Sequence, residues 1–205
     1  MRKQIALSAA ALVALGIGGT YLWTTIKEPA RQFAACSGST VAGGAIGGPF
    51  SLTDEAGAAV TDADVITGPT LIYFGYTFCP DVCPTDVSRN AIATDVLEEQ
   101  GHTVTPVFIS VDPKRDTPER LAEFTDFMHP RMIGLTGTPE QIAAAAKEYR
   151  TVYQLHDDED PDFYLVDHMT FTYLAFPEAG VVDFFRREAS PEEIAERTSC
   201  FINAL

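Results

Sequence analysis

The longest apolar stretch of the chain lies at its N-terminus. Residues 5–26 contain no charged side chain and end near Tyr21 and Trp23. A helix of roughly 20 residues spans the ~30 Å hydrocarbon core of a bilayer, and the flanking Arg2 and Lys3 favour a cytoplasmic N-terminus. We therefore expect residues 1–26 to be a membrane anchor that places the rest of the chain outside the cytoplasm. A cleaved signal peptide is the alternative, although its apolar region is usually only ~7–15 residues long.

Farther along, the apolar pattern predicts buried strands alternating with amphipathic helices. Residues 70–75 and 107–111 are apolar at nearly every position, as expected of strands buried on both faces. Between them, residues 84–100 carry apolar side chains at helical spacing, and Gly101 follows where a helix would end.

Three further helices are predicted by a hydroxyl residue followed by proline and glutamate. The hydroxyl caps free backbone N–H groups, proline fits the first helical position, and the acid meets the positive end of the helix dipole. These motifs begin at Thr117, Thr138 and Ser190, and Gln141 and Glu193 would complete capping boxes after the last two.

The remaining strand candidates complete the order of elements. They are residues 50–53, 133–135, 151–155, 170–176 and 181–185, with a hairpin turn at 177–180 between the last two. The order β-α-β-α-β-α followed by β-β-α predicts an α/β sandwich with a mixed sheet, and specifically a thioredoxin-like fold. We expect residues 27–48 to be a linker and 49–205 to be this domain.

Composition excludes some function classes. The 205 residues include 29 acidic and 14 basic side chains, a net charge of −15, so the basic surface that nucleic-acid binding requires is missing. Hydrophobic residues make up 46% and charged residues 21%, as in folded rather than disordered chains.

Cys79 and Cys83 are the first candidates for chemistry. They follow strand 70–75 directly and lie at the start of the next helix, where open α/β sheets place their ligands. A helix N-terminus lowers the pKa of a thiol and so favours the thiolate, which attacks disulfides and binds metals. Three residues separate this pair, whereas redox pairs in this fold have two between them, so both a metal site and a Cys79–Cys83 disulfide stay open.

His168 is the candidate for a third ligand. It lies just before strand 170–176, and in a thioredoxin-like fold the loop before that strand passes close to the cysteine turn. Two thiolates and an imidazole suit copper, whereas structural zinc normally takes four protein ligands. Asp167 is a candidate to orient the His168 ring as a hydrogen-bond acceptor, although neighbouring side chains in an extended segment usually diverge.

Cys36 and Cys200 lie near opposite ends of the expected domain. Because unpaired thiols are unusual outside the cytoplasm, we predict a structural disulfide between them. The alternative is lipid attachment at Cys36 in the string Phe-Ala-Ala-Cys, but this string is distant from the apolar run.

Four motifs together resemble those of the Sco/SenC family of copper chaperones. They are YFGYTFCPDVCP at 73–84, SVDPKRDTP at 110–118, GLTG at 134–137 and VDH at 166–168, within a resemblance that runs from about Gly47 to the C-terminus. Met169 stands where many members have a small polar residue, a difference that we expect to leave ligation unaffected.

The resemblance implies a thioredoxin-like domain that is anchored in the inner membrane and faces the periplasm. It implies that Cys79, Cys83 and His168 bind copper, as Cu(I), Cu(II) or both. The implied partners are an upstream copper donor and subunit II of cytochrome c oxidase, whose dinuclear copper centre receives the metal. Such a metallochaperone is not an enzyme. The alternatives are a thiol–disulfide oxidoreductase that uses Cys79 and Cys83 to keep target cysteines reduced, and a copper or redox sensor.

Overall fold

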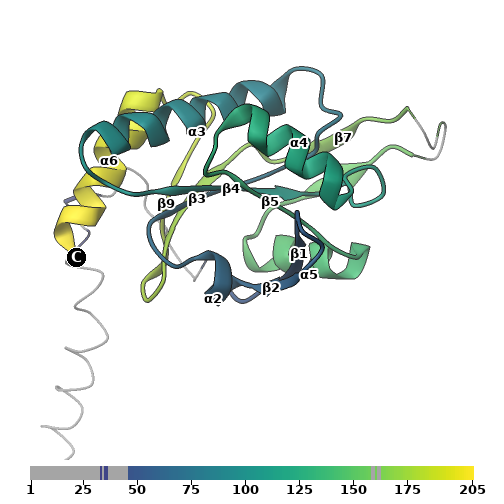
Figure 1. Cartoon of the computed structure of the whole chain (residues 1–205), viewed down its shortest axis with the longest axis horizontal. Helices are drawn as coiled ribbons and strands as arrows, with labels where there is room; N and C mark the ends of the chain where they lie inside the picture. Colours follow the sequence, from purple (N-terminus) through teal and green to yellow (C-terminus); the bar gives the residue numbers. More distant parts are fainter. Residues whose placement is uncertain (1–32, 34, 37–45, 158–159, 161–162) are drawn as a thin grey trace, which may run out of the picture.

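The computed structural model describes residues 33, 35–36, 46–157, 160 and 163–205 (Figure 1). The expected membrane anchor at 1–26 and most of the expected linker at 27–48 lie outside the described residues. Within the described ranges, no helix is both long enough and apolar enough to cross a membrane.

The core of the domain is a mixed seven-stranded sheet. Its strand order is β2-β1-β5-β4-β3-β8-β9. Strands β3, β4 and β5 are parallel, whereas β8 runs antiparallel to both β3 and β9. The strands are β1 (Ser51–Asp54), β2 (Ala59–Thr61), β3 (Thr70–Gly75), β4 (Thr105–Ser110), β5 (Ile133–Thr136), β8 (Thr172–Phe176) and β9 (Gly180–Phe185). The predicted α/β sandwich with a mixed sheet and a closing hairpin is confirmed.

Helices cover both faces of this sheet. Helices α3 (Val82–Glu99), α4 (Pro118–Met128) and α6 (Pro191–Ala204) lie on one side, and α2 (Asp62–Val65) and α5 (Pro139–Glu148) on the other (Figure 1). Strand β3 is central, and every one of its residues is buried. The apolar run at 70–75 therefore follows from its position between two helical layers.

The predicted helix starts agree with the structure at all three motifs. The side chains of Thr117, Thr138 and Ser190 each accept a hydrogen bond from a backbone N–H of the first turn. The capping box at Thr138 is complete. The one predicted at Ser190 is wrong, because the Glu193 carboxylate accepts a hydrogen bond from Arg197 one turn later instead of reaching back.

The sequence patterns did not reveal three of the short elements. These are β2, α2 and β7 (Val166–His168), each three or four residues long. Strand β7 pairs with β6 (Tyr153–Leu155) in a separate two-stranded sheet. Segments this short have too few positions for an apolar period, and only pairing with distant segments makes them regular.

A disulfide joins Cys36 to Cys200, with 5.6 Å between their Cα atoms. It ties the segment before the domain to α6, where the Phe33 ring lies 5.2 Å from that of Phe201. The bond uses the thiol that lipid attachment at Cys36 would require.

Candidate metal centre

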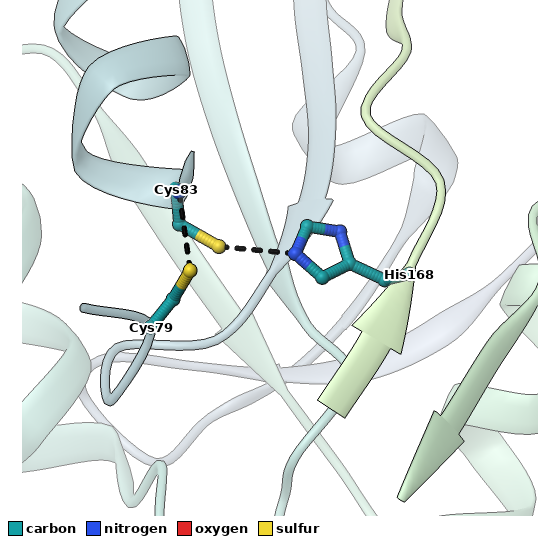
Figure 2. Close-up of side chains that lie close together, drawn as sticks. All are labelled: Cys79, Cys83 and His168. Atoms are coloured by element: carbon teal, nitrogen blue, oxygen red, sulfur yellow. Dashed lines mark hydrogen bonds between the residues drawn. The ribbon is translucent and has the colours of Figure 1, made fainter. Parts of the chain in front are cut away.

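The two cysteines of the turn occupy different backbone environments. Cys79 lies in the irregular segment after β3, whereas Cys83 is the second residue of α3. Both carry free thiols, and the backbone N–H of Cys83 donates to Cys79 Sγ over 3.2 Å (Figure 2). The start of the helix therefore directs an N–H group at the Cys79 sulfur, as the sequence predicts.

Gly75 makes room for the Cys83 side chain. A Cβ atom at Gly75 would lie 3.0 Å from Cys83 Sγ and 2.9 Å from the Tyr73 ring. Such contacts are too short for an unstrained core. The absent side chain at the end of β3 therefore lets the Cys83 sulfur lie directly over the strand.

His168 comes to the cysteines from the last position of β7. Its Nε2 atom lies 3.2 Å from Cys83 Sγ (Figure 2). Its Nδ1 atom lies 3.0 Å from the carbonyl oxygen of Met169. Because a carbonyl only accepts, Nδ1 carries the proton of the neutral ring, and the lone pair of Nε2 faces the sulfur. This is the tautomer that a metal ligand bound through Nε2 requires.

Aromatic rings surround the imidazole. The rings of Tyr73 and Tyr76 meet it edge-on, with centroid separations of 6.0 and 5.8 Å. The sequence placed His168 in a loop, but its backbone pairs with Tyr153 in the two-stranded sheet. The imidazole is therefore held by backbone pairing as well as by packing.

The hypothesis that Asp167 orients the His168 ring is wrong. The Asp167 carboxylate lies 2.8 Å from Nε2 of His156 instead. Successive side chains of a strand point to opposite faces, so Asp167 faces away from the cysteines. The carbonyl oxygen of Met169 orients the ring in its place.

The two thiols have opposite pKa shifts. The hydrogen bond with the Cys83 thiol, supported by the backbone N–H groups of Cys83 and Asp81, lowers the pKa of Cys79 to about 4. The same interaction and burial raise the pKa of Cys83. The metal-free pair is therefore a thiolate at Cys79 next to a thiol at Cys83.

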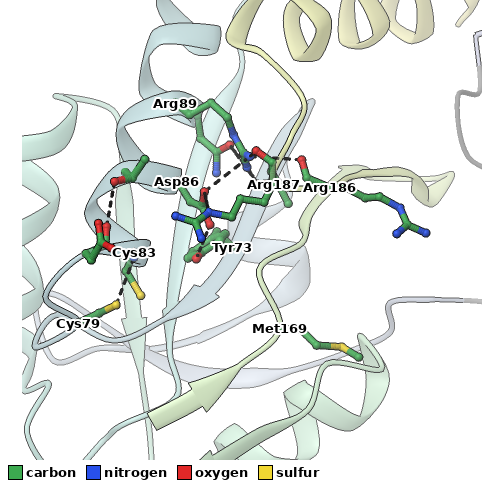
Figure 3. A network of polar contacts seen from close by, with 12 residues as sticks. Tyr73, Cys79, Cys83, Asp86, Arg89, Met169, Arg186 and Arg187 are labelled. Atoms are coloured by element: carbon green, nitrogen blue, oxygen red, sulfur yellow. Dashed lines mark hydrogen bonds and ion pairs between the residues drawn. The ribbon is translucent and has the colours of Figure 1, made fainter. Parts of the chain in front are cut away.

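A buried polar network lies behind Cys83 (Figure 3). The Tyr73 hydroxyl donates to Asp86 over 3.0 Å, and Arg89 lies 3.7 Å from the same carboxylate. Burial raises the pKa of Asp86, and the nearby guanidinium opposes this rise. Arg89 also donates to the carbonyl oxygen of Arg187 over 2.6 Å. The sequence did not indicate this network, because the spacing of polar residues in a helix does not show which of them are buried.

Met169 does not complete the site. Its side chain points away from Cys79 and Cys83 (Figure 3).

The ligand atoms of Cys79, Cys83 and His168 all lie within 4.8 Å of one another. Cys79 and His168 border a cavity of about 260 Å³ that Tyr76 and Leu165 also line. The arrangement offers two sulfurs and one nitrogen to a soft ion and leaves a side open to a partner.

Comparison with known proteins gives the family. The sequence model described as SCO1/SenC matches residues 39–203. Protein SenC of Rhodobacter capsulatus is 55% identical, over 99% of this chain and 92% of that protein. The chain belongs to the SCO1/SenC family.

Relatives and solved structures of the Sco family extend this likeness. Protein SCO1 homolog 1, mitochondrial, of Arabidopsis thaliana is 40% identical over 90% of this chain and 57% of its own length. The crystal structure of Arabidopsis thaliana ScoI with copper bound has a TM-score of 0.73 and 41% identity, covering 78% of this chain and 100% of that one. For Bradyrhizobium japonicum ScoI with copper bound, the TM-score is 0.68 at 38% identity, with coverage of 78% and 100%. The thioredoxin-like fold expected from the sequence is thus shared with solved Sco structures.

Proposed function

We propose that this chain is a membrane-anchored copper metallochaperone. It binds copper through Cys79, Cys83 and His168 and delivers the metal to the dinuclear copper centre of cytochrome c oxidase subunit II. The observation that carries the proposal is the convergence of two sulfurs and one imidazole nitrogen within 4.8 Å of one another. The copper-bound Sco structures, 41% and 38% identical to this chain, support copper as the cargo.

The donor set suits transfer as well as binding. Thiolate and imidazole are soft to borderline ligands that favour copper. Three protein ligands leave a coordination position open, and the cavity beside them admits a ligand from a partner. Copper can therefore pass to cysteines and histidines of the acceptor by stepwise ligand exchange without release of the free ion.

The proposed location is the periplasmic face of the inner membrane, with residues 1–26 as a single-pass anchor. Two observations support it. Residues 5–26 carry no charge and follow two basic residues. The disulfide between Cys36 and Cys200 is of a kind that persists in oxidising compartments.

A thiol–disulfide oxidoreductase is the second candidate, favoured by the lowered pKa of Cys79. In that reaction the Cys79 thiolate attacks a target disulfide and forms a mixed disulfide, and one target sulfur leaves as a thiolate. Cys83, once deprotonated, then attacks Cys79 Sγ and releases the second target sulfur. The target is reduced to two thiols, and the pair Cys79–Cys83 is oxidised to a disulfide.

His168→Ala separates the two candidates. Removing the imidazole from a three-ligand site should weaken copper binding of the reduced full-length protein in detergent by about 10–100-fold or more. Thiol exchange with a small disulfide should change little. His156→Ala is the matched control, because His156 bonds to Asp167 on the opposite face of β7. Equal copper affinity of the His168→Ala variant and the parent would contradict the proposed metallochaperone function.

A further inference from the structure

The strand that carries His168 is not part of the main sheet. Among the residues that the structure describes, strand β7 pairs only with β6, and these two form a sheet of their own. Cys79 and Cys83, by contrast, follow a central strand of the seven-stranded sheet. Within the described ranges, no ladder of backbone hydrogen bonds therefore joins β7 to the main sheet. Besides the three-residue connection from β7 to β8, which pairs with β3, contacts of side chains fix the distance between the imidazole and the sulfurs.

The loop between β4 and α4, residues 111–117, supplies these contacts to both halves of the site. Its Asp116 accepts hydrogen bonds from the backbone N–H of Thr77 over 3.0 Å and from the Thr77 hydroxyl over 2.6 Å. Its Asp112 is fully buried and accepts a hydrogen bond from the Tyr164 hydroxyl over 2.6 Å. Thr77 lies just before Cys79, and Tyr164 precedes the strand that ends at His168. The loop thus holds the cysteine turn at one end and the histidine strand at the other.

Arg115 is the residue of this loop that contacts both halves. Its side chain is only 9% exposed, and its Nε donates to Asp112 over 2.5 Å. A second guanidinium nitrogen donates to the carbonyl oxygen of Tyr164 over 2.9 Å, and the guanidinium carbon lies 3.5 Å from the centroid of the Tyr164 ring. The guanidinium also lies over the rings of Phe78 and Tyr76, at 4.8 and 5.6 Å.

We propose that Arg115 is a positioning residue that holds His168 against the sulfurs of Cys79 and Cys83. The inference rests on the proposed function, because it concerns the same site. A guanidinium suits this positioning role because its planar set of donors binds Asp112 and the Tyr164 carbonyl while its face stacks on aromatic rings. A lysine ammonium keeps the charge but cannot make these contacts together.

The first test compares Arg115→Met with Arg120→Met. The Arg120 guanidinium lies over Phe78 at 4.4 Å and its side chain is exposed, so it is a matched control that contacts the cysteine side of the site. Cu(I) affinity of the reduced full-length protein in detergent is measured by competition with a chromophoric chelator. We expect Arg115→Met to weaken binding by about 10–100-fold, the range found for residues that orient metal ligands. Arg120→Met should stay within twofold of the parent.

A double variant asks whether Arg115 acts through His168. In a His168→Ala background, Arg115→Met should weaken Cu(I) binding no further, because there is no imidazole left to position. Parent-like Cu(I) affinity of Arg115→Met would overturn the proposal. It would also be overturned if Arg115→Met lowered Cu(I) affinity by the same factor in the parent and in the His168→Ala background. If the parent and His168→Ala bind copper equally, the proposed function fails, and that result is distinct from either of these.

A measurement without metal tests the positioning directly. In the metal-free protein, the NMR signals of the His168 ring should move toward those of a solvent-exposed imidazole in Arg115→Met and stay in place in Arg120→Met. Should Arg115→Met not fold, Arg115→Lys replaces it, since it removes the paired contacts with Asp112 and the Tyr164 carbonyl and keeps the charge. Unmoved His168 signals in a folded Arg115 variant would overturn the proposal whatever the copper data show.

Discussion

The Nε2 atom of His168 lies 3.2 Å from the Sγ atom of Cys83, although 85 positions separate the two residues in the chain. One comes from the end of a short strand in a two-stranded sheet, and the other from the first turn of a helix. The Cys79 sulfur completes the group, since the ligand atoms of the three residues all lie within 4.8 Å of one another. A metal ion between them would bind all three ligands with little rearrangement of the backbone.

Cys79 should react as a thiolate far below the ordinary pKa of a cysteine. Its pKa is lowered to about 4, so the reactive form is present above this pH and disappears as the pH falls through it. We expect iodoacetamide to modify Cys79 at pH 6 and Cys83 only slowly, with the rate at Cys79 nearly constant between pH 6 and 8. Mass spectrometry of peptides from the metal-free protein measures both rates.

Cys83→Ala provides the control for this reactivity. The hydrogen bond with the Cys83 thiol is the largest cause of the lowered pKa. Its removal should raise the pKa of Cys79 and slow the modification at pH 6. If the pH profile of Cys79 is the same with and without Cys83, the interaction between the two sulfurs is not its cause.

Gly75→Ala should damage the site by crowding it. The new Cβ would lie 3.0 Å from Cys83 Sγ and from the Phe108 ring. We expect the sulfur to move, copper binding to weaken, and the free energy of unfolding to fall by about 1–3 kcal/mol, as for overpacked cores. Gly68→Ala is the control, because a Cβ at Gly68 meets nothing within 4 Å. Equal urea midpoints and copper affinities for the two variants would contradict this role of Gly75.

The disulfide between Cys36 and Cys200 should stabilise the fold without affecting copper. It closes a loop of 164 positions, and loss of a native disulfide typically costs about 2–5 kcal/mol. Cys36 packs in a hydrophobic cluster with Leu97 and Phe201, separate from the cluster that contains Cys79 and Cys83. Urea unfolding of Cys36→Ser/Cys200→Ser should show the loss of stability, and Cu(I) competition should give parent-like affinity. A large loss of copper affinity in the folded variant would show that the two regions are coupled.

The sequence predicted the strands of the main sheet other than β2, and the helix starts, because their signals are local. The apolar run at β3 and the Thr-Pro-Glu motif before α4 and α5 depend on neighbouring residues alone. Strand β7 has three residues and is regular because it pairs with β6. Its alternation of apolar and polar positions is too short to predict a strand.

The candidate ligands could also be predicted, but their supports could not. Residue chemistry and the family resemblance predict Cys79, Cys83 and His168 as ligands, and the structure brings them together. The roles of Gly75 and Arg115 depend on contacts between segments that are distant in sequence. Asp167 was wrongly assigned because its partner, His156, lies across the two-stranded sheet.

X-ray absorption spectroscopy of the copper-loaded, reduced protein tests the central claim most directly. We predict one copper per chain with two sulfur neighbours and one nitrogen neighbour, and loss of the nitrogen in His168→Ala with both sulfurs retained. A first shell with fewer than two sulfurs, or one that His168→Ala leaves unchanged, would contradict the account.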